Sequence, residues 1–102
     1  MESEEILISE IFKALSSPLR IKILKILKEK NICQCEFASL LNENPVNISR
    51  AFSGLVDLEI VEGEKRGNKI FPKIKNEKVF KLLEIAEEIA KEIASERVKK
   101  YS

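Results

Sequence analysis

The 102-residue sequence contains no histidine and no tryptophan, and only two cysteines, three glycines and three prolines. The absence of histidine excludes Ser-His and Cys-His nucleophile pairs, the most common general base and every histidine-containing zinc site. No other acid–base pair, nucleophile arrangement or phosphate-binding loop is recognisable, so we expect a protein that is not an enzyme. The small share of glycine and proline argues against the disordered and fibrous classes.

Long apolar runs are also missing from the sequence. The segment Ile6-Leu7-Ile8 is typical of the longest ones, and such runs are too short to span a bilayer, so we expect no contact with membranes. Cys33 and Cys35 lie two residues apart in a chain without a recognisable signal peptide, which does not fit a secreted disulfide framework. We therefore expect the protein in the reducing cytoplasm.

Neither sign of charge is in large excess. The net charge is +1, from 18 Lys and Arg against 17 Asp and Glu, and this total gives no argument for a nucleic-acid partner. The local distribution is uneven, because four Glu fall within the first ten residues whereas residues 65–75 carry five positive charges and no negative one. With 44% hydrophobic and 34% charged residues, the chain is expected to form a single domain over residues 1–102.

Apolar residues at spacings of three and four predict two helices at the start of the chain. The first covers residues 4–15. Ser17 is the expected N-cap of the second and Pro18 its first residue, and this helix continues to about residue 30. Between its apolar positions lie four cations that we expect to stay solvated, namely Arg20, Lys22, Lys25 and Lys28.

The middle of the chain predicts a helix-turn-helix over residues 36–58. Two short helices, over 36–41 and 45–58, flank a polar turn in which Asn44 is the expected N-cap of the second helix. The positions of this second helix that are not expected in the core are Val46, Asn47, Ser49, Arg50, Ser53 and Gly54.

A β-hairpin is predicted over residues 60–74. Gly67-Asn68 suits a two-residue turn with positive φ, and Pro72 marks the second strand as an edge strand. The hairpin and the residue after it carry the basic run of Lys65, Arg66, Lys69, Lys73 and Lys75. These cations can neutralise phosphates, or they can protect an exposed strand edge from aggregation.

The longest predicted helix covers residues 77–100 and has a heptad seam that a domain of this size cannot bury against its own core. The N-terminal segment 1–15 is also strongly apolar. We therefore predict a two-fold homodimer through the first and last helices. Its expected interface consists of Leu7, Ile11, Val79, Leu82, Ala86, Ile89 and Ile93. The alternative is that both helices fold back over the helix-turn-helix as ordinary core.

This order of elements is that of a winged helix-turn-helix, a mainly α fold with a small β-hairpin as the wing. The blocks ALSSPLRIKIL (14–24), ICQCEF (32–37) and VNISRAF (46–52) resemble the ArsR/SmtB family. These proteins are small dimeric repressors of bacteria and archaea, and many of them sense metals or metalloids. The resemblance runs from about residue 11 to residue 74, and it implies a homodimeric repressor that binds a palindromic operator in double-stranded DNA.

The chain departs from the family pattern at three positions. Asn42 and Glu59 stand where the family commonly has glycine, and Glu43 stands where it has an apolar residue. The turn between the two short helices is therefore more polar than is usual in the family.

The resemblance makes residues 45–58 the recognition helix and places Asn47, Ser49 and Arg50 on DNA. Asn pairs with adenine and Arg with guanine in the major groove, and Ser meets either a base edge or a phosphate. The complete set of expected DNA contacts is Asn47, Ser49, Arg50, Ser53, Lys65, Arg66 and Lys69. The competing hypothesis is a winged-helix module that contacts proteins and does not bind specific DNA.

Cys33 and Cys35 stand at the predicted start of the helix before the turn, where the helix dipole favours a thiolate. In the ArsR/SmtB family this Cys-x-Cys belongs to a metal or metalloid site, often with a third Cys at the position of Ala38 here. Three alternatives stay open: a site for a soft metal or metalloid ion, the one cofactor we consider; a redox-active disulfide; or no thiol-based sensing, with Cys35 packed as a small apolar residue.

Overall fold

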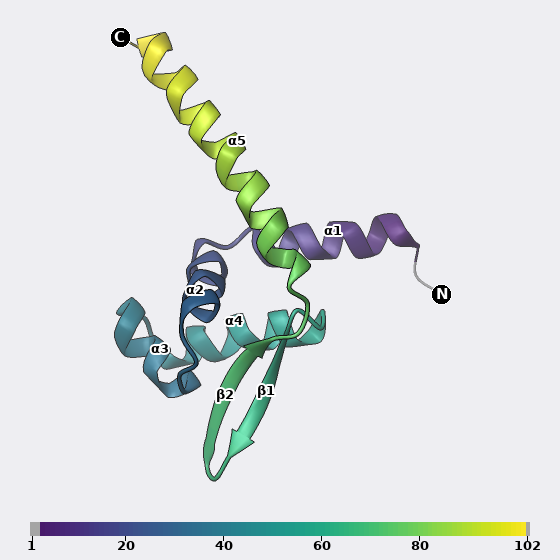
Figure 1. Cartoon of the computed structure of the whole chain (residues 1–102), viewed down its shortest axis with the longest axis vertical. Coiled ribbons are helices and arrows are strands. Elements are labelled where there is room, and N and C mark those ends of the chain that lie inside the picture. Colours follow the sequence, from purple (N-terminus) through teal and green to yellow (C-terminus); the bar gives the residue numbers. More distant parts are fainter. Residues whose placement is uncertain (1–2, 102) are drawn as a thin grey trace.

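The computed structural model describes residues 3–101, so Met1, Glu2 and Ser102 of the predicted domain lie outside the described residues. Within this range the chain forms five helices and one antiparallel hairpin. Figure 1 shows them in the order α1 (Glu4–Leu15), α2 (Pro18–Glu29), α3 (Gln34–Leu41), α4 (Pro45–Asp57), β1 (Val61–Arg66), β2 (Lys69–Ile74) and α5 (Lys78–Tyr101). The mainly α winged-helix prediction is confirmed, and α3 begins at Gln34 rather than at the expected residue 36.

Local capping explains where α2 and α4 begin. The Ser17 hydroxyl accepts the backbone N–H of Arg20, and Pro18 occupies the first turn of α2. The Asn44 side-chain oxygen accepts the backbone N–H of Val46 at 2.7 Å at the start of α4. Both predicted N-caps are confirmed, and each satisfies a backbone donor that has no partner within its helix.

Two departures from the family pattern coincide with unusual backbone. Asn42, which ends α3, has a φ of 49°, and Glu59, which follows α4, has a φ of 59°. This left-handed region carries a steric cost for residues with a Cβ, although Asn tolerates it better than most. The glycine expected from the resemblance at both positions therefore has a physical reason, and Glu59 is the more strained of the two replacements.

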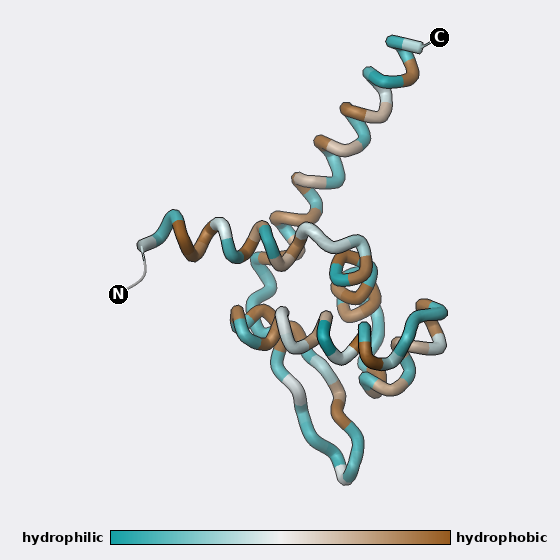
Figure 2. The backbone as a smooth tube through the Cα atoms, turned by 180° about the vertical axis from the view of Figure 1, so that it is seen from behind, coloured by the Kyte–Doolittle hydropathy of each residue, from teal (hydrophilic) through white to brown (hydrophobic). Residues whose placement is uncertain are grey.

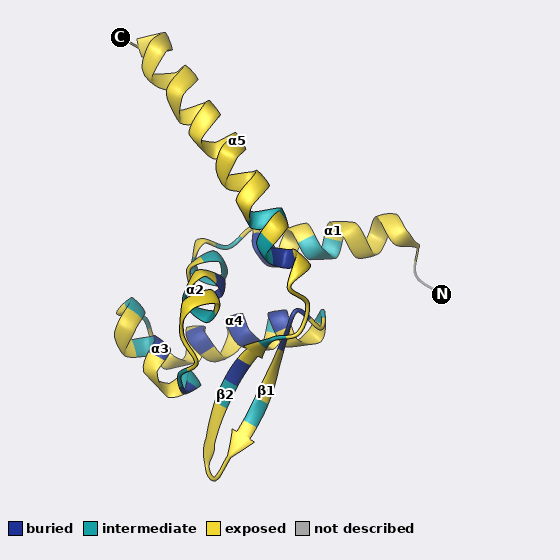
Figure 3. Ribbon diagram, viewed as in Figure 1, coloured by how far each residue is buried: buried dark blue, intermediate teal, exposed yellow. Residues whose placement is uncertain are grey.

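The core lies where α2, α3 and α4 meet the base of the hairpin and the start of α5. The Phe37 and Phe52 rings form a T-shaped pair with centroids 5.0 Å apart, and both rings are buried. Figure 3 shows that burial is concentrated in this body, whereas the far end of α5, the start of α1 and the hairpin tip are exposed. Val79 joins this core with only 6% of its surface exposed.

The hairpin, called the wing below, extends from the body on the side opposite to α5 (Figure 1). Arg66 pairs with Lys69 at the end of the ladder, and Gly67 has a φ of 64°, so the predicted two-residue turn is confirmed. Pro72 pairs with Gly63 in a sheet of two strands, and a missing N–H donor is tolerated because both strands are edge strands.

Helices α1 and α5 both present apolar side chains to solvent. Figure 2 shows hydrophobic segments recurring along both helices beyond the body. The structure contradicts the alternative in which both helices fold back over the helix-turn-helix. Of the seven predicted interface residues, Leu7, Ala86, Ile89 and Ile93 are exposed, Ile11 and Leu82 are half-buried against the core, and Val79 is buried.

Val79 is therefore a correction to the predicted interface. It lies in the first turn of α5, which is still packed on the body, so its side chain serves the core of its own chain. Between residues 3 and 101, no helix has the length and apolar content needed to cross a membrane.

Candidate nucleic-acid interface

The outward side of α4 is defined by the burial of the opposite side. Ile48, Ala51, Phe52 and Leu55 are buried in the core. The helical spacing then turns four of the predicted contact residues to solvent on one side, and all four are exposed: Asn47, Ser49, Arg50 and Ser53. The structure thus brings these side chains together as the sequence predicts.

Glu43 holds the side chain of Asn47 in place. The Nδ2 group of Asn47 donates to Glu43 Oε1 at 2.9 Å, and the same oxygen accepts the backbone N–H of Asn44 at 3.0 Å. These hydrogen bonds, that from the Asn47 side chain first, keep the pKa of Glu43 below its usual value. Glu43 was not among the predicted site residues, although its spacing of four from Asn47 across the turn was a visible signal.

Arg20 covers the position predicted to be open at Gly54. A Cβ atom at Gly54 would collide with the Arg20 guanidinium, and Arg20 Nη1 donates to the carbonyl oxygen of Ala14 at 3.4 Å. Arg20 is half-buried and not fully solvated as expected. One side chain thus links the end of α1, the start of α2 and the middle of α4, which gives Arg20 of the block ALSSPLRIKIL (14–24) a structural role.

Carboxylates offset part of the positive charge that residues 65–75 bring to the wing. Glu64, just before this run, lies within ion-pair distance of two of its cations, Arg66 at 3.3 Å and Lys73. The pairing lowers the pKa of Glu64, through Lys73 first and then Arg66. Lys75 pairs with Glu59 at 3.4 Å.

Two cations of the wing remain without a carboxylate partner among the described residues. They are Lys65 and Lys69, both exposed and both near the turn of the hairpin. Arg66, in contrast, also stacks over the Phe71 ring, with its guanidinium carbon 4.3 Å from the ring centroid. Of the three predicted wing contacts, Lys65 and Lys69 are therefore available as they stand, and Arg66 is held within the wing.

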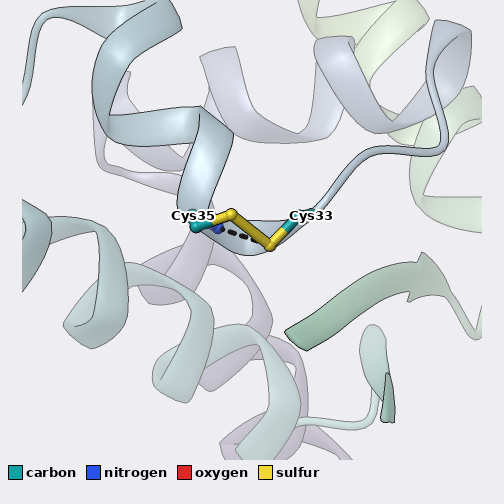
Figure 4. Close-up of a disulfide and its surroundings, with 2 residues drawn as sticks. All are labelled: Cys33 and Cys35. Atoms are coloured by element: carbon teal, nitrogen blue, oxygen red, sulfur yellow. Dashed lines mark hydrogen bonds between the residues drawn. A yellow bond between two sulfur atoms is a disulfide. The ribbon is translucent and has the colours of Figure 1, made fainter. Parts of the chain in front are cut away.

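The two cysteines form a disulfide at the start of α3. Figure 4 shows Cys33 just before the helix and Cys35 in its first turn, with the backbone N–H of Cys35 donating to Cys33 Sγ at 3.2 Å. Cys33 is the buried partner, with 2% of its surface exposed, and Cys35 is exposed. The expectation that Cys35 packs as the apolar partner is wrong, because Cys33 caps the helix on its core side.

These sulfurs do not make a complete metal site within the described chain. They are bonded to each other, and no group of three or more His, Cys, Asp or Glu side chains among residues 3–101 is placed to hold a metal ion. Soft ions are usually held by several thiolates or by thiolates with imidazole. The side chains of residues 3–101 in one protomer therefore do not fit a bound metal in this state.

Comparison with known proteins agrees with this architecture, although no family model matches the chain. Over 87 residues it is 30% identical to the cadmium resistance transcriptional regulatory protein CadC of Listeria innocua, which covers 84% of this chain and 73% of that protein. Over 62 residues it is 36% identical to the arsenical resistance operon repressor of Staphylococcus xylosus, covering 61% of this chain and 60% of the repressor.

A solved structure shows the same fold. The homodimeric winged helix-turn-helix DNA-binding domain of Mb0332 from Mycobacterium bovis, a possible ArsR-family regulator, matches with a TM-score of 0.76. The match covers 90% of each chain at 22% identity. The relatives are transcriptional regulators and not enzymes, as the sequence predicts for this chain. The chain belongs to the ArsR/SmtB family of winged helix-turn-helix transcriptional repressors.

Proposed function

We propose that the protein is a homodimeric repressor that binds a palindromic operator in double-stranded DNA through α4 and the wing. The observation that carries this proposal is the exposed polar side of α4, which lies beside a wing with two unpaired cations. Because its target is operator DNA, we place the protein in the cytoplasm.

The N-terminal half of α4 supplies the base contacts in this proposal. Arg50 is exposed and reads guanine through two hydrogen bonds, and Asn47 reads adenine. Ser49 and Ser53 contact either a base edge or a phosphate. Glu43 acts as a positioning residue, since it occupies one amide donor of Asn47 and thereby sets which way the remaining amide atoms face.

The wing supplies the contacts that do not depend on sequence. Lys65 and Lys69 neutralise phosphates directly, whereas Arg66 first exchanges Glu64 for a phosphate. Each phosphate contact adds about 0.9 to the slope of log affinity against log salt. A dimer that uses the unpaired lysines of both wings should therefore release DNA steeply as salt rises.

The exposed apolar sides of α1 and α5 fit a second copy of this chain. Leu7, Ile89 and Ile93 have between 42% and 50% of their surface exposed. The homodimeric state named for the Mb0332 domain supports a homodimer of this chain. A two-fold axis at this surface presents two copies of α4, and for that reason the operator is palindromic.

Selection of binding sites from random double-stranded DNA, followed by mobility shifts at two salt concentrations, tests this function. We expect a palindromic preferred site and weaker binding at the higher salt concentration. Binding without a preferred sequence, or no binding, would instead support a winged-helix module for protein contacts. Sedimentation of the free protein tests the homodimer separately.

Relatives named for cadmium and arsenical resistance make a soft metal or metalloid ion one candidate signal for this repressor. The bonded state of Cys33 and Cys35 supports a redox signal instead. Titration of the reduced protein with cadmium and arsenite, followed by thiolate absorbance, separates the two. Stoichiometric binding supports the ion as the signal, whereas a change in DNA affinity on oxidation alone supports the disulfide.

A further inference from the structure

We propose that Cys35 is a modification site for a small thiol that carries a carboxylate, and that the added group sits in the hollow between α3, α4 and the wing. The hollow has a volume of about 400 Å³, at the lower end of the range for small-molecule sites. It is lined by Cys33, Gln34, Cys35, Ala38, Pro45, Ile48, Asn68, Lys69 and Ile70. The chemistry concerns the cysteine pair alone, and only its effect on DNA rests on the proposed function.

The two sulfurs differ in how an attacking thiolate can reach them. Cys33 is buried, whereas Cys35 is exposed and lines the hollow. Thiol–disulfide exchange proceeds by attack of a thiolate on one sulfur, and access decides which sulfur is attacked. The structure therefore directs attack to Cys35.

The start of α3 stabilises the leaving sulfur, Cys33 Sγ, as a thiolate. Cys33 Sγ accepts the backbone N–H of Cys35 at the first turn of α3. A thiolate on Cys33 keeps this hydrogen bond, and the positive end of the helix dipole faces it. Both features favour Cys33 as the leaving group.

The charge of the hollow selects the incoming thiol. Lys69 is the one charged side chain among the residues that line it, and Lys69 has no carboxylate partner among residues 3–101. A carboxylate on the incoming thiol supplies that partner. The remaining lining is largely apolar and suits a short alkyl chain, with the amides of Gln34 and Asn68 as hydrogen-bonding groups.

The proposed step conserves atoms and electrons. The sulfur of the small thiolate forms a bond with Cys35 Sγ while the bond between Cys33 and Cys35 breaks, and the electron pair of that bond stays on Cys33 as a thiolate. The two protein sulfurs begin as a disulfide, and Cys35 ends in a mixed disulfide. A second thiolate, attacking the added sulfur, releases the small molecule as its own disulfide and leaves both cysteines reduced.

The adduct changes the surface proposed to meet DNA. The hollow borders the first turn of α4 at Pro45 and the wing at Lys69. A bound carboxylate pairs with Lys69 and cancels its positive charge next to the phosphates. We therefore expect the modified protein to bind DNA more weakly, by about fivefold for one lost phosphate contact in each protomer.

The test uses the oxidised full chain and three small thiols of similar size: 3-mercaptopropionate, 2-mercaptoethanol and cysteamine. Reactions are stopped with N-ethylmaleimide, and the adducts are located by mass spectrometry of the peptide that contains residues 33–35. We expect the adduct on Cys35 and the maleimide on Cys33. Per thiolate, we expect 3-mercaptopropionate to react about tenfold faster than cysteamine, because their charges interact oppositely with Lys69.

The variants Lys69→Gln and Lys65→Gln form a matched pair. Both remove an unpaired wing lysine, but Lys65 does not line the hollow. We expect Lys69→Gln to abolish the preference for the carboxylate and Lys65→Gln to keep it. An adduct on Cys33, or an unchanged preference in Lys69→Gln, overturns the proposal.

Single-cysteine variants keep the test decisive if the mixed disulfide is short-lived. Cys33→Ser retains a good N-cap residue and leaves Cys35 free to react with 3,3′-dithiodipropionate. We expect it to react at least about tenfold faster than Cys35→Ser, whose remaining thiol is buried. Equal rates contradict the proposal. A stable adduct on Cys35 without any DNA binding by the unmodified protein would refute the proposed function and leave this modification site intact.

Discussion

The outward side of α4 and the wing, the two surfaces proposed to meet DNA, hold their polar groups in opposite ways. On α4, Arg50 is exposed and makes no ion pair with any described residue. On the wing, Glu64 already engages both Arg66 and Lys73. Arg50 is therefore ready to bind a base, whereas Arg66 and Lys73 must first give up contacts within the protein before they bind phosphate. Readout and affinity should consequently respond differently to mutation.

The largest effect should come from Arg50. Because this residue contacts bases in the proposed complex, its loss should reduce base discrimination with little loss of general DNA affinity. Arg50→Ala should cost about 1–3 kcal/mol of discrimination at one base pair of each half-site, because a bidentate contact with guanine is lost. Competition binding with operators changed at single positions measures this loss. An unchanged base preference would remove Arg50 from direct readout.

Removal of the Glu64 carboxylate should leave the cations of the wing without an ion-pair partner among the described residues, as Arg50 is on α4. Glu64→Gln frees Arg66 and Lys73, so affinity for all DNA sequences should rise about fivefold at low salt with a steeper salt dependence. Lys69→Ala should lower the affinity for all DNA sequences and make its salt dependence shallower. Lys69 has no carboxylate partner within the described chain, so its removal takes away a phosphate contact without freeing another charge. Mobility shifts over a series of salt concentrations test both variants, and equal slopes in Glu64→Gln and the parent protein would show that the ion pairs do not compete with DNA.

A Glu43 variant tests whether the side chain of Asn47 on α4 is held in place by this carboxylate. Glu43→Gln should reduce the preference for adenine opposite Asn47 by about threefold, since the amide of Asn47 loses a charge-assisted hydrogen bond. The lowered pKa of Glu43 keeps its carboxylate ionised above 4.5, and the contact is lost only as the pH falls through that lowered value. Base preference at this position should therefore stay constant between pH 8 and about pH 5. A change near neutral pH would show that another group controls Asn47.

The last prediction concerns fold stability and the segment that joins α4 to β1. Glu59→Gly should stabilise the fold by about 0.5–1 kcal/mol, because glycine accepts a φ of 59° without steric cost. Chemical denaturation measures the change, with Glu59→Ala as the matched control that keeps the strain while removing the ion pair to Lys75. Equal stabilities of the two variants would show that the backbone of this segment stores no strain.

Local signals explain how much of the fold could be predicted from the sequence. The N-caps at Ser17 and Asn44, the turn at Gly67-Asn68 and the outward polar side of α4 depend on residues close together in sequence. Helical spacing alone predicts that Arg50 faces solvent and that Phe52 faces the core.

The parts that were missed depend on contacts between elements. The burial of Arg20 over Gly54 requires that α2 cross α4, and no sequence pattern fixes that crossing. The pairing of Glu64 with Lys73 requires the hairpin to close in one register. The heptad pattern places Val79 in the dimer seam, because such a pattern cannot show how much of a helix still packs on its own domain.

The pairing of Glu64 with both Arg66 and Lys73 has a further consequence for how DNA binding depends on ionic strength. When phosphates take Arg66 and Lys73, the freed carboxylate gathers a cation from solution while the DNA releases its own. Net ion release is then smaller than the number of phosphate contacts. Occupancy of the operator would thus vary less with the ionic strength of the cell than the basic residues of the wing alone would require.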